Sequence, residues 1–261
     1  MRVSLIFLSI SIAACSDQSI TPETQYNELA EVISGYDYLQ PDTQILQEDE
    51  FSNPGFLWVD KGEELFNLPA KNGKSCATCH SSDKRSLIGV AAGYPRYDSR
   101  VKALINIEGR INLCRKDHQS EDTLAYESEP LLALTTYVAN QSKGSPIVGA
   151  LQAEARSNFK QGQTYFNTKR GQFNLSCAQC HNGNVGKNLR GDTISQGHGN
   201  GFPAYRLEWQ TLGSLHQRFQ YCDIGVRAEP LPSGSQTYID LEYFLNHRSA
   251  GLPIETPAIR R

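Results

Sequence analysis

The pentapeptide CATCH at Cys76–His80 occurs a second time, with one residue changed, as CAQCH at Cys177–His181. The pattern C-x-x-C-H is the attachment signature of haem c. Its two thiols bond to the haem vinyl groups, and the adjoining histidine supplies one axial nitrogen to the iron. Two copies in one chain therefore predict two covalently bound haem c groups.

The residues of the two motifs divide into covalent anchors and iron ligands. We expect the anchors to be Cys76, Cys79, Cys177 and Cys180, and the proximal iron ligands to be His80 and His181. A zinc site with four cysteine ligands is the alternative use of two C-x-x-C pairs. The pairs are separated by 97 residues (176 − 79 = 97). Zinc does not require the histidine that follows each pair, so we favour haem.

The ligand on the far side of each iron is not set by the motifs. Methionine is a common second ligand in cytochromes c, but the only methionine of the chain is Met1. The remaining candidates are Cys114, Cys222, His118, His198, His216 and His247. Three arrangements stay open: histidine on both sides of each iron, cysteine opposite histidine, and a Cys114–Cys222 disulfide, which an oxidising compartment favours.

An internal repeat favours the cysteines as ligands. The segment YPRY at 94–97 reappears as FPAY at 202–205, 108 residues later (202 − 94 = 108). Cys114 and Cys222 are separated by the same 108 residues, whereas the four spare histidines do not correspond across the repeat. Each repeated module thus has one haem motif and one spare cysteine. We expect Cys114 and Cys222 to be the distal iron ligands.

Arg218 lies four residues before Cys222, so on a helix the two side chains share a face. A guanidinium beside a thiol lowers the thiol pKa, and its planar set of donors can hold a tetrahedral oxyanion such as a sulfonate. The alternatives for Arg218 are a salt bridge to Asp223 or to a haem propionate, and a solvated position. Cys114 is followed by Arg115, which faces elsewhere on a helix. This difference predicts an electron-transferring first module and an anion-binding second module.

The fold is expected to be mainly α, with two cytochrome c-like modules related by internal duplication, long loops and an N-terminal arm. GEELFN at 62–67 precedes the first haem motif, and GQTYFN at 162–167 precedes the second. Apolar residues at helical spacing predict helices over 131–138 and 238–245. The expected divisions are an export segment (1–15), a poorly packed arm (16–50), the first module (51–148) and the second module with the anion site (149–261).

The N-terminus predicts export to the periplasm. Met1 and Arg2 precede the apolar stretch 3–14, which is typical of a short secretory signal. The segment 12–15 resembles a lipoprotein processing site, so Cys15 is a candidate lipid anchor. Ordinary cleavage nearby is the alternative. The net charge of −3 gives no electrostatic basis for binding nucleic acid.

Further segments, together with the haem motifs, resemble the SoxA family, the dihaem subunits of the SoxAX cytochromes of bacterial thiosulfate oxidation. The segments are INLCR (111–115), GDTISQG (191–197), YRLEWQ (205–210) and GVRAEP (225–230), joined by Arg218 and Cys222. The resemblance covers both modules. So many joint matches make it specific.

The resemblance implies roles for individual residues. Cys114 and Cys222 would be the distal ligands of the first and second haem, Cys222 would carry a persulfide, and Arg218 would bind substrate. It also implies an L-cysteine S-thiosulfotransferase, which couples thiosulfate oxidatively to a cysteine of the carrier SoxYZ. Two electrons leave to an external cytochrome c, and the monohaem cytochrome SoxX is the partner subunit. A lipid anchor at Cys15 departs from the family pattern.

Two other functions are compatible with the motifs. A dihaem electron carrier needs both haems and no bound substrate. A dihaem peroxidase needs an iron with a displaceable ligand and an acid–base residue beside it, for which His216 is the candidate. Two matched cysteine ligands argue against the peroxidase.

Overall fold

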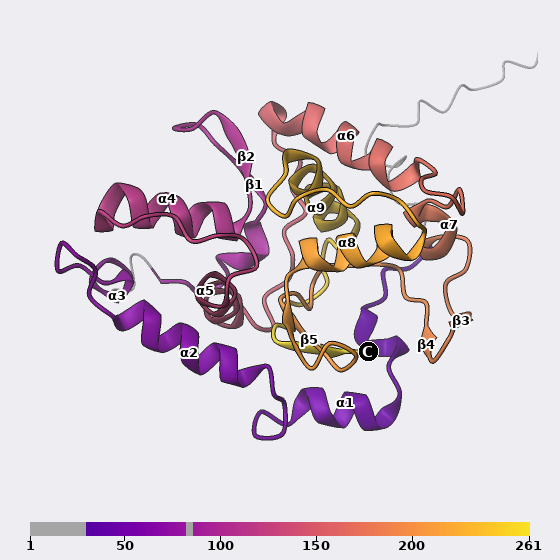
Figure 1. The fold of residues 1–261 in the computed structure, drawn as a ribbon, viewed down its shortest axis with the longest axis horizontal. Coiled ribbons are helices and arrows are strands. Elements are labelled where there is room, and N and C mark those ends of the chain that lie inside the picture. Colours follow the sequence, from indigo (N-terminus) through magenta and orange to yellow (C-terminus); the bar gives the residue numbers. More distant parts are fainter. Residues whose placement is uncertain (1–29, 82–85) are drawn as a thin grey trace, which may run out of the picture.

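Two sets of helices follow one another in the same order along the chain, as Figure 1 shows for this computed structural model, which describes residues 30–81 and 86–261. The first set comprises α2 (Phe56–Asn67), α3 (Cys76–His80), η4 (Ala91–Gly93), β1 (Arg96–Asp98), β2 (Ala103–Ile105), α4 (Ile107–Gln119) and α5 (Glu129–Asn140). The second comprises η5 (Ala153–Ala155), α6 (Arg156–Asn167), α7 (Cys177–His181), β3 (Asn188–Leu189), β4 (Asp192–Thr193), β5 (Ala204–Arg206), β6 (Thr211–Gly213), α8 (Leu215–Gly225) and α9 (Gln236–Arg248). The predicted mainly α fold of two duplicated modules is confirmed.

The strands are short and serve to position the helices. β1 pairs with β2, and β5 pairs with β6, each as an antiparallel hairpin that leads into the next helix. The C-terminal strand β7 (Ala258–Arg260) adds to β5 in parallel. The predicted helices over 131–138 and 238–245 lie within α5 and α9. Within the described ranges, none of the helices combines the length and the apolar character needed to cross a bilayer.

Glycines allow the first helix of each module to cross the last one closely. Gly62 lies where α2 meets α5, and a Cβ added there would overlap the carbonyl oxygen of Ala133. Gly162 holds the same place between α6 and α9, where a Cβ would overlap the carbonyl oxygen of Asp240. A helix normally loses stability at an interior glycine. The glycine that opens both repeated hexapeptides is therefore explained by packing.

Each haem motif forms a short helix that begins at a serine. Ser75 Oγ accepts a hydrogen bond from the Thr78 amide at 3.1 Å, and Thr78 Oγ1 accepts one from the Ser75 amide at 3.1 Å. Ser176 and Gln179 form the same reciprocal capping box at the start of α7. Such caps satisfy amides that have no partner in the first helical turn. The caps therefore fix where each motif starts to wind.

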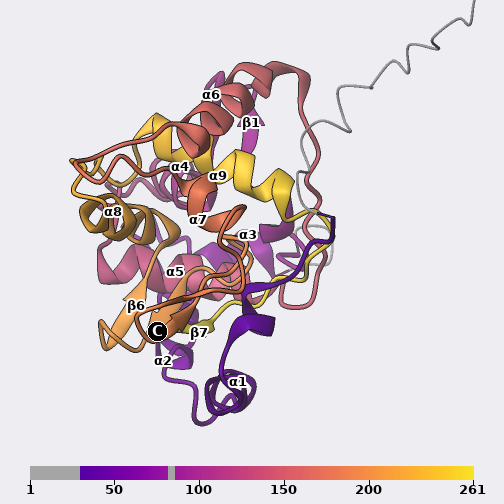
Figure 2. The same cartoon turned by 90° about the vertical axis from the view of Figure 1, so that its right-hand side faces the viewer.

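The main core lies between α6 and α9 and reaches into the first module. The rings of Phe159 and Phe166 lie 5.4 and 5.3 Å from the ring of Phe244. Leu104 of β2 belongs to the same buried cluster, although β2 is part of the first module. Figures 1 and 2 both draw the β1–β2 hairpin beside α6. The two modules therefore share one hydrophobic core.

The described part of the N-terminal arm packs against the second module. It forms η2 (Gly35–Tyr38) and α1 (Pro41–Glu48). Gln47 Oε1 accepts hydrogen bonds from the Ile259 amide at 3.0 Å and from Arg260 Nη1 at 2.6 Å. Asn200 Nδ2 donates to Ser34 Oγ at 3.1 Å. These contacts differ from the loose packing that we expected, because the partners are far away in sequence. The export segment and Cys15 lie outside the described residues.

A partly buried acidic cluster lies where α4 meets α8 and α9. His216 Nε2 and Glu242 Oε2 are 3.2 Å apart, and the Gly234 amide donates to His216 Nδ1 at 2.9 Å. Burial, followed by the Glu242 carboxylate, raises the pKa of Glu108 to about 7. The Glu127 carboxylate also raises it, whereas His216 lowers it. The contact between the modules thus contains more acid than base.

We expect Glu108→Gln to stabilise the protein only at neutral and alkaline pH. The folded-state pKa of Glu108 lies above its usual value of 4.5. Its contribution to stability is therefore complete below pH 4.5 and is lost as the pH rises to about 7. Thermal melts should show a higher melting temperature for the variant at pH 8 and the same temperature as wild type at pH 4. The exposed Glu63→Gln is the control. An equal difference at both pH values would contradict this assignment.

We expect Gly162→Ala to destabilise the second module by about 1–3 kcal/mol, because the added methyl group forces α6 away from α9. Gly62→Ala should do the same to the first module. Gly225→Ala is the control, since a Cβ there meets no atom within 4 Å. Chemical denaturation of the three variants measures the effect. Equal stability of Gly162→Ala and Gly225→Ala would show that the crossing tolerates a side chain.

Candidate functional site

Each spare cysteine lies beside the haem motif of its own module. The six cysteines of the described residues are free thiols, so Cys114 and Cys222 are not joined by a disulfide. Burial raises the pKa of Cys76, and the nearby Cys114 thiol adds to this effect. Burial likewise raises the pKa of Cys177 to about 11, with a further contribution from Cys222. Charge interactions of this kind weaken with distance, so α4 and α8 bring each cysteine to its own motif.

The helices that carry the spare cysteines begin at equivalent capped positions. Asn106 Oδ1 accepts from the Gly109 amide at 3.0 Å at the start of α4. Ser214 Oγ accepts from the Gln217 amide at 3.0 Å at the start of α8. The two caps are 108 residues apart (214 − 106 = 108), as are the two cysteines. The spare cysteines therefore lie at the same turn of equivalent helices.

The geometry around His181 suits an iron ligand. Its Nδ1 donates to the Ser195 carbonyl oxygen at 2.7 Å, which leaves the lone pair on Nε2. Burial lowers the pKa of His181 to about 4, so the imidazole is neutral at pH 7. Gly197 packs against the ring, where an added Cβ would lie 2.7 Å from His181 Cγ. In the first module the ring of His80 lies 6.1 Å from that of Phe66. Two free thiols and a neutral imidazole on one short helix are the donor set that haem c requires.

The zinc alternative finds no support in the described ranges. No group of three or more cysteine, histidine or acidic side chains gathers there around a common point. Figure 1 draws α3 and α7, which carry the two C-x-x-C pairs, on opposite sides of the molecule. A zinc site with four cysteine ligands requires all four sulfurs within a single coordination shell. The two pairs therefore serve separate groups.

The spare histidines have other surroundings. His216 is 2% exposed and is held by Glu242 and Gly234. His198 is buried, and its Nε2 lies 2.9 Å from Gln196 Oε1. The ring of His247 packs edge-on against Phe159 and Tyr243, with centroids 4.9 and 5.3 Å away. His118 lies exposed at the end of α4. The hydrogen bonds of His216 leave it poorly placed as the acid–base residue of a peroxidase.

The carboxylate of Asp223 is occupied and does not pair with Arg218. It accepts hydrogen bonds from Arg170 Nη2 at 2.6 Å, from Tyr165 Oη at 2.8 Å and from Tyr238 Oη at 2.7 Å. Across the described part of the chain, the ion pairs do not include Arg218. The salt bridge to Asp223 that we considered for Arg218 is therefore not formed, and its guanidinium remains available to an anion.

A second arginine lies near Arg218. Arg206 at the end of β5 is 4% exposed, and its guanidinium carbon lies 5.0 Å from the centroid of the Trp209 ring. Burial, followed by the positive charge of Arg218, lowers the pKa of Arg206 to about 10. The charges of Glu208 and Cys222 act in the opposite direction. The surroundings of Cys222 thus contain two guanidinium groups.

Comparison with known proteins places these features in a family. The family model described as "SoxA/TsdA, cytochrome c domain" matches residues 61–147 and 161–254. The chain belongs to the SoxA/TsdA cytochrome c family. Haem c is accordingly the cofactor of this chain, as the sequence predicted.

Named relatives of this SoxA-family chain cover most of its length. It is 37% identical over 233 residues to the L-cysteine S-thiosulfotransferase subunit SoxA of Pseudaminobacter salicylatoxidans, covering 88% of this chain and 82% of that protein. It is 33% identical over 241 residues to the protein of the same name from Rhodovulum sulfidophilum, covering 92% and 84%. The crystal structure of SoxXA from P. pantotrophus matches with a TM-score of 0.83 and 31% identity, covering 88% of this chain and 87% of that chain.

The sequence comparison of the modules missed one arginine. Arg110, and not Arg115, is the counterpart of Arg218 in this SoxA-family chain (218 − 110 = 108). Arg110 also lies four residues before its cysteine, Cys114, so the difference predicted at this position is wrong. Arg115 instead lies 3.6 Å from Glu121. Applying the offset of 108 to every charged residue of α4 is the signal that finds Arg110.

We expect Gly197→Ala to disturb the proximal ligand of the second haem, because the new methyl group pushes against the ring of His181. The absorption and paramagnetic resonance spectra of the purified protein should show altered ligation at one haem. Gly89→Ala is the matched control. It is the equivalent position of the first module (197 − 89 = 108), with a similar φ of 73° against 76°, but its Cβ meets only Ser145 Oγ at 3.8 Å. Identical spectra for the two variants would contradict the role of Gly197.

Proposed function

We propose that this chain is the catalytic dihaem subunit of an L-cysteine S-thiosulfotransferase. It couples thiosulfate oxidatively to a cysteine thiol of the carrier protein SoxYZ. The observation that carries the proposal is the arrangement on α8, where Arg218 and Cys222 share a helix face and Asp223 pairs with Arg170 instead. The relatives that share both modules are named for this activity.

We infer that two haem c groups are bound, one per module. The residues that hold them are Cys76, Cys79, His80 and Cys114 in the first module, and Cys177, Cys180, His181 and Cys222 in the second. The support is that each module has two free thiols, a following histidine and one further cysteine near the motif. When bound, haem supplies one-electron redox chemistry and thiolate ligation lowers its potential.

The reaction joins two sulfur atoms and releases two electrons. A carrier thiolate and thiosulfate form R–S–S–SO3⁻, with one new S–S bond. Two electrons leave to two molecules of an external cytochrome c. The proton of the carrier thiol goes to solvent. Charge balances, since RS⁻ and S2O3²⁻ together carry the charge of the product and the two electrons.

Arg218 and Cys222 divide the work on the chain's side. Arg218 binds the sulfonate oxygens and so directs the outer sulfur of thiosulfate towards Cys222. Cys222 carries a persulfide sulfur to which the outer sulfur bonds. The carrier thiolate then attacks this sulfur, and the sulfonate-bearing group moves to the carrier by thiol–disulfide exchange. Cys222 thus serves as a covalent intermediate as well as a ligand.

The setting follows from the same proposal. The partners are a monohaem SoxX subunit, the carrier SoxYZ and an external cytochrome c. The similarity to a SoxXA structure supports the first of these. The protein acts in the periplasm after export, with a candidate lipid anchor at Cys15. We retain the divisions at 15/16, 50/51 and 148/149 as the proposed domain boundaries.

We expect Cys222→Ser to abolish thiosulfate coupling and to change the spectrum of one haem. Intact mass measurement and peptide mapping of the wild type should find two haems and one extra sulfur atom on the peptide of Cys222. The peptide of Cys114 provides the internal control and should carry no extra sulfur. A variant that keeps coupling activity would remove the transferase mechanism and favour a plain electron carrier. A Cys114–Cys222 disulfide would remove the ligation scheme as well.

A further inference from the structure

The duplicated module uses equivalent arginines differently in its two copies. In the first module, Arg110 Nη2 bonds to the buried Asp98 carboxylate. Arg110 Nε donates to Tyr94 Oη at 3.1 Å. The arginine beside Cys114 is therefore fully paired within its own module and has no need of an external anion.

The residues equivalent to both partners of Arg110 are different in the second module. The counterpart of Tyr94 is Phe202, which has no hydroxyl (202 − 94 = 108). The counterpart of Asp98 is Arg206, which reverses the charge (206 − 98 = 108). Asp98 and Arg206 each end the first strand of their hairpin, so they occupy the same place relative to the helix that follows.

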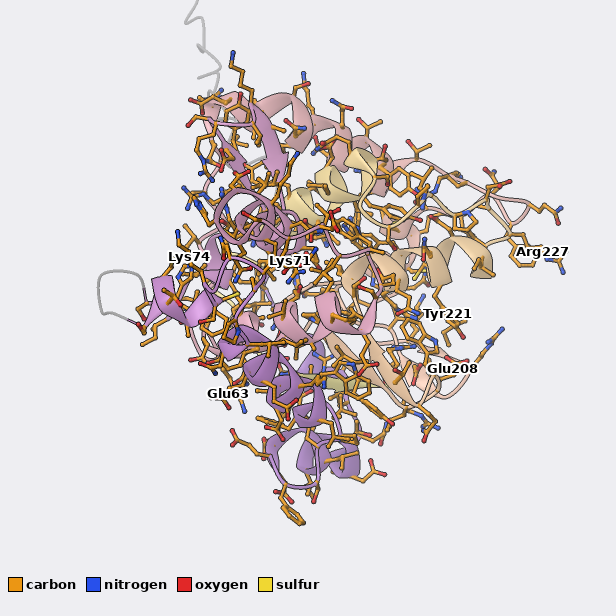
Figure 3. The ribbon with its side chains drawn as sticks, turned by 60° about the vertical axis from the view of Figure 1, so that its left-hand side comes forward. Glu63, Lys71, Lys74, Glu208, Tyr221 and Arg227 are labelled. Carbon is orange, nitrogen blue, oxygen red and sulfur yellow. The ribbon has the colours of Figure 1, made fainter. Side chains whose placement is uncertain are left out.

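Arg206 itself lacks a close anionic partner. Its Nε is buried without a hydrogen-bond partner among the described residues. Its Nη2 lies 3.7 Å from Oε2 of Glu208, which is beyond hydrogen-bond distance. Glu208 also accepts a hydrogen bond from Tyr221 Oη at 2.6 Å, and Figure 3 shows these two residues side by side. A buried charge is costly unless a counter-charge satisfies it.

The two arginines of the second module converge on one aromatic ring. The guanidinium carbon of Arg218 lies 5.5 Å from the centroid of the Tyr221 ring, and that of Arg206 lies 6.0 Å from it. Tyr221 immediately precedes Cys222 on α8. Two like charges near one another favour an anion between them, and a dianion matches their total charge.

We propose that Arg206 is a second anion-binding residue, which holds the sulfonate group of thiosulfate together with Arg218. The charge reversal from Asp98 to Arg206 confines anion binding to the second of two otherwise equivalent cysteine sites. This inference rests on the proposed function and identifies what makes the second site able to bind its substrate. Arg218 directs the anion from the helix, and Arg206 does so from the strand.

The test measures thiosulfate binding to the assembled dihaem protein by calorimetry, without carrier or electron acceptor. Arg206→Gln should weaken binding about tenfold or more, because it removes a charged hydrogen-bond donor. Arg206→Asp recreates the first-module pair and should weaken binding further by engaging Arg218. Arg206→Lys keeps the charge and should lose less than Arg206→Gln. The control is Arg100→Gln, which removes the same charge from an exposed side chain of the first module and should leave binding unchanged.

A second variant avoids changing a buried residue. The side chain of Glu208 is 49% exposed, and its charge opposes that of Arg206. Glu208→Gln should therefore strengthen thiosulfate binding, with unchanged haem spectra. Unaltered affinity in both Arg206→Gln and Glu208→Gln would overturn the inference. A changed spectrum of the second haem with unaltered affinity would also overturn it, because Arg206 would then serve a haem propionate.

These outcomes are separate from a failure of the proposed function. If Arg206→Gln binds normally while Cys222→Ser loses coupling, the inference fails and the proposed function stands. If the wild type neither binds nor couples thiosulfate, the proposed function itself fails. Weakened binding in Arg206→Gln, with the Arg100→Gln control intact, supports both.

Discussion

The buried carboxylate of Asp223 is the interaction on which the orientation of α8 depends. It is 1% exposed and accepts hydrogen bonds from three other segments, through Tyr165 of α6, Arg170 before α7 and Tyr238 of α9. A buried carboxylate is tolerated only when such donors surround it. Because Cys222 is the preceding residue, the same network fixes which face of α8 meets the second haem motif. It also leaves the nearby cations without this carboxylate as a partner.

Duplication explains both the similarity of the modules and their difference in charge. The close helix crossings at Gly62 and Gly162, the capped haem helices and the hairpins are the same in both. These features depend on shape and backbone hydrogen bonds, which either copy satisfies in the same way. The charges beside the spare cysteine differ, since an ion pair in one copy is replaced by two cations in the other. A few side chains on a common scaffold thus separate the proposed roles of the modules.

Much of the candidate site could be predicted because its chemistry depends on residues that are close in sequence. The motifs at 76–80 and 177–181 identify haem attachment, and the spacing of Arg218 and Cys222 places them on one helix face. Arg206 was missed as a site residue because it lies on a strand, and only the turn into α8 brings it near Arg218. The partners of the N-terminal arm were missed for the same reason, since Gln47 bonds to residues more than 200 positions away.

The sequence by itself determined the class of cofactor, the duplication and the two spare cysteines, because covalent attachment and helix periodicity are local properties of the chain. Only the tertiary structure decided which charges face one another. It paired Asp223 with Arg170, and it paired Asp98 with Arg110. Whether an arginine is neutralised depends on side chains brought together by folding. Electrostatic interactions act through space and not along the chain.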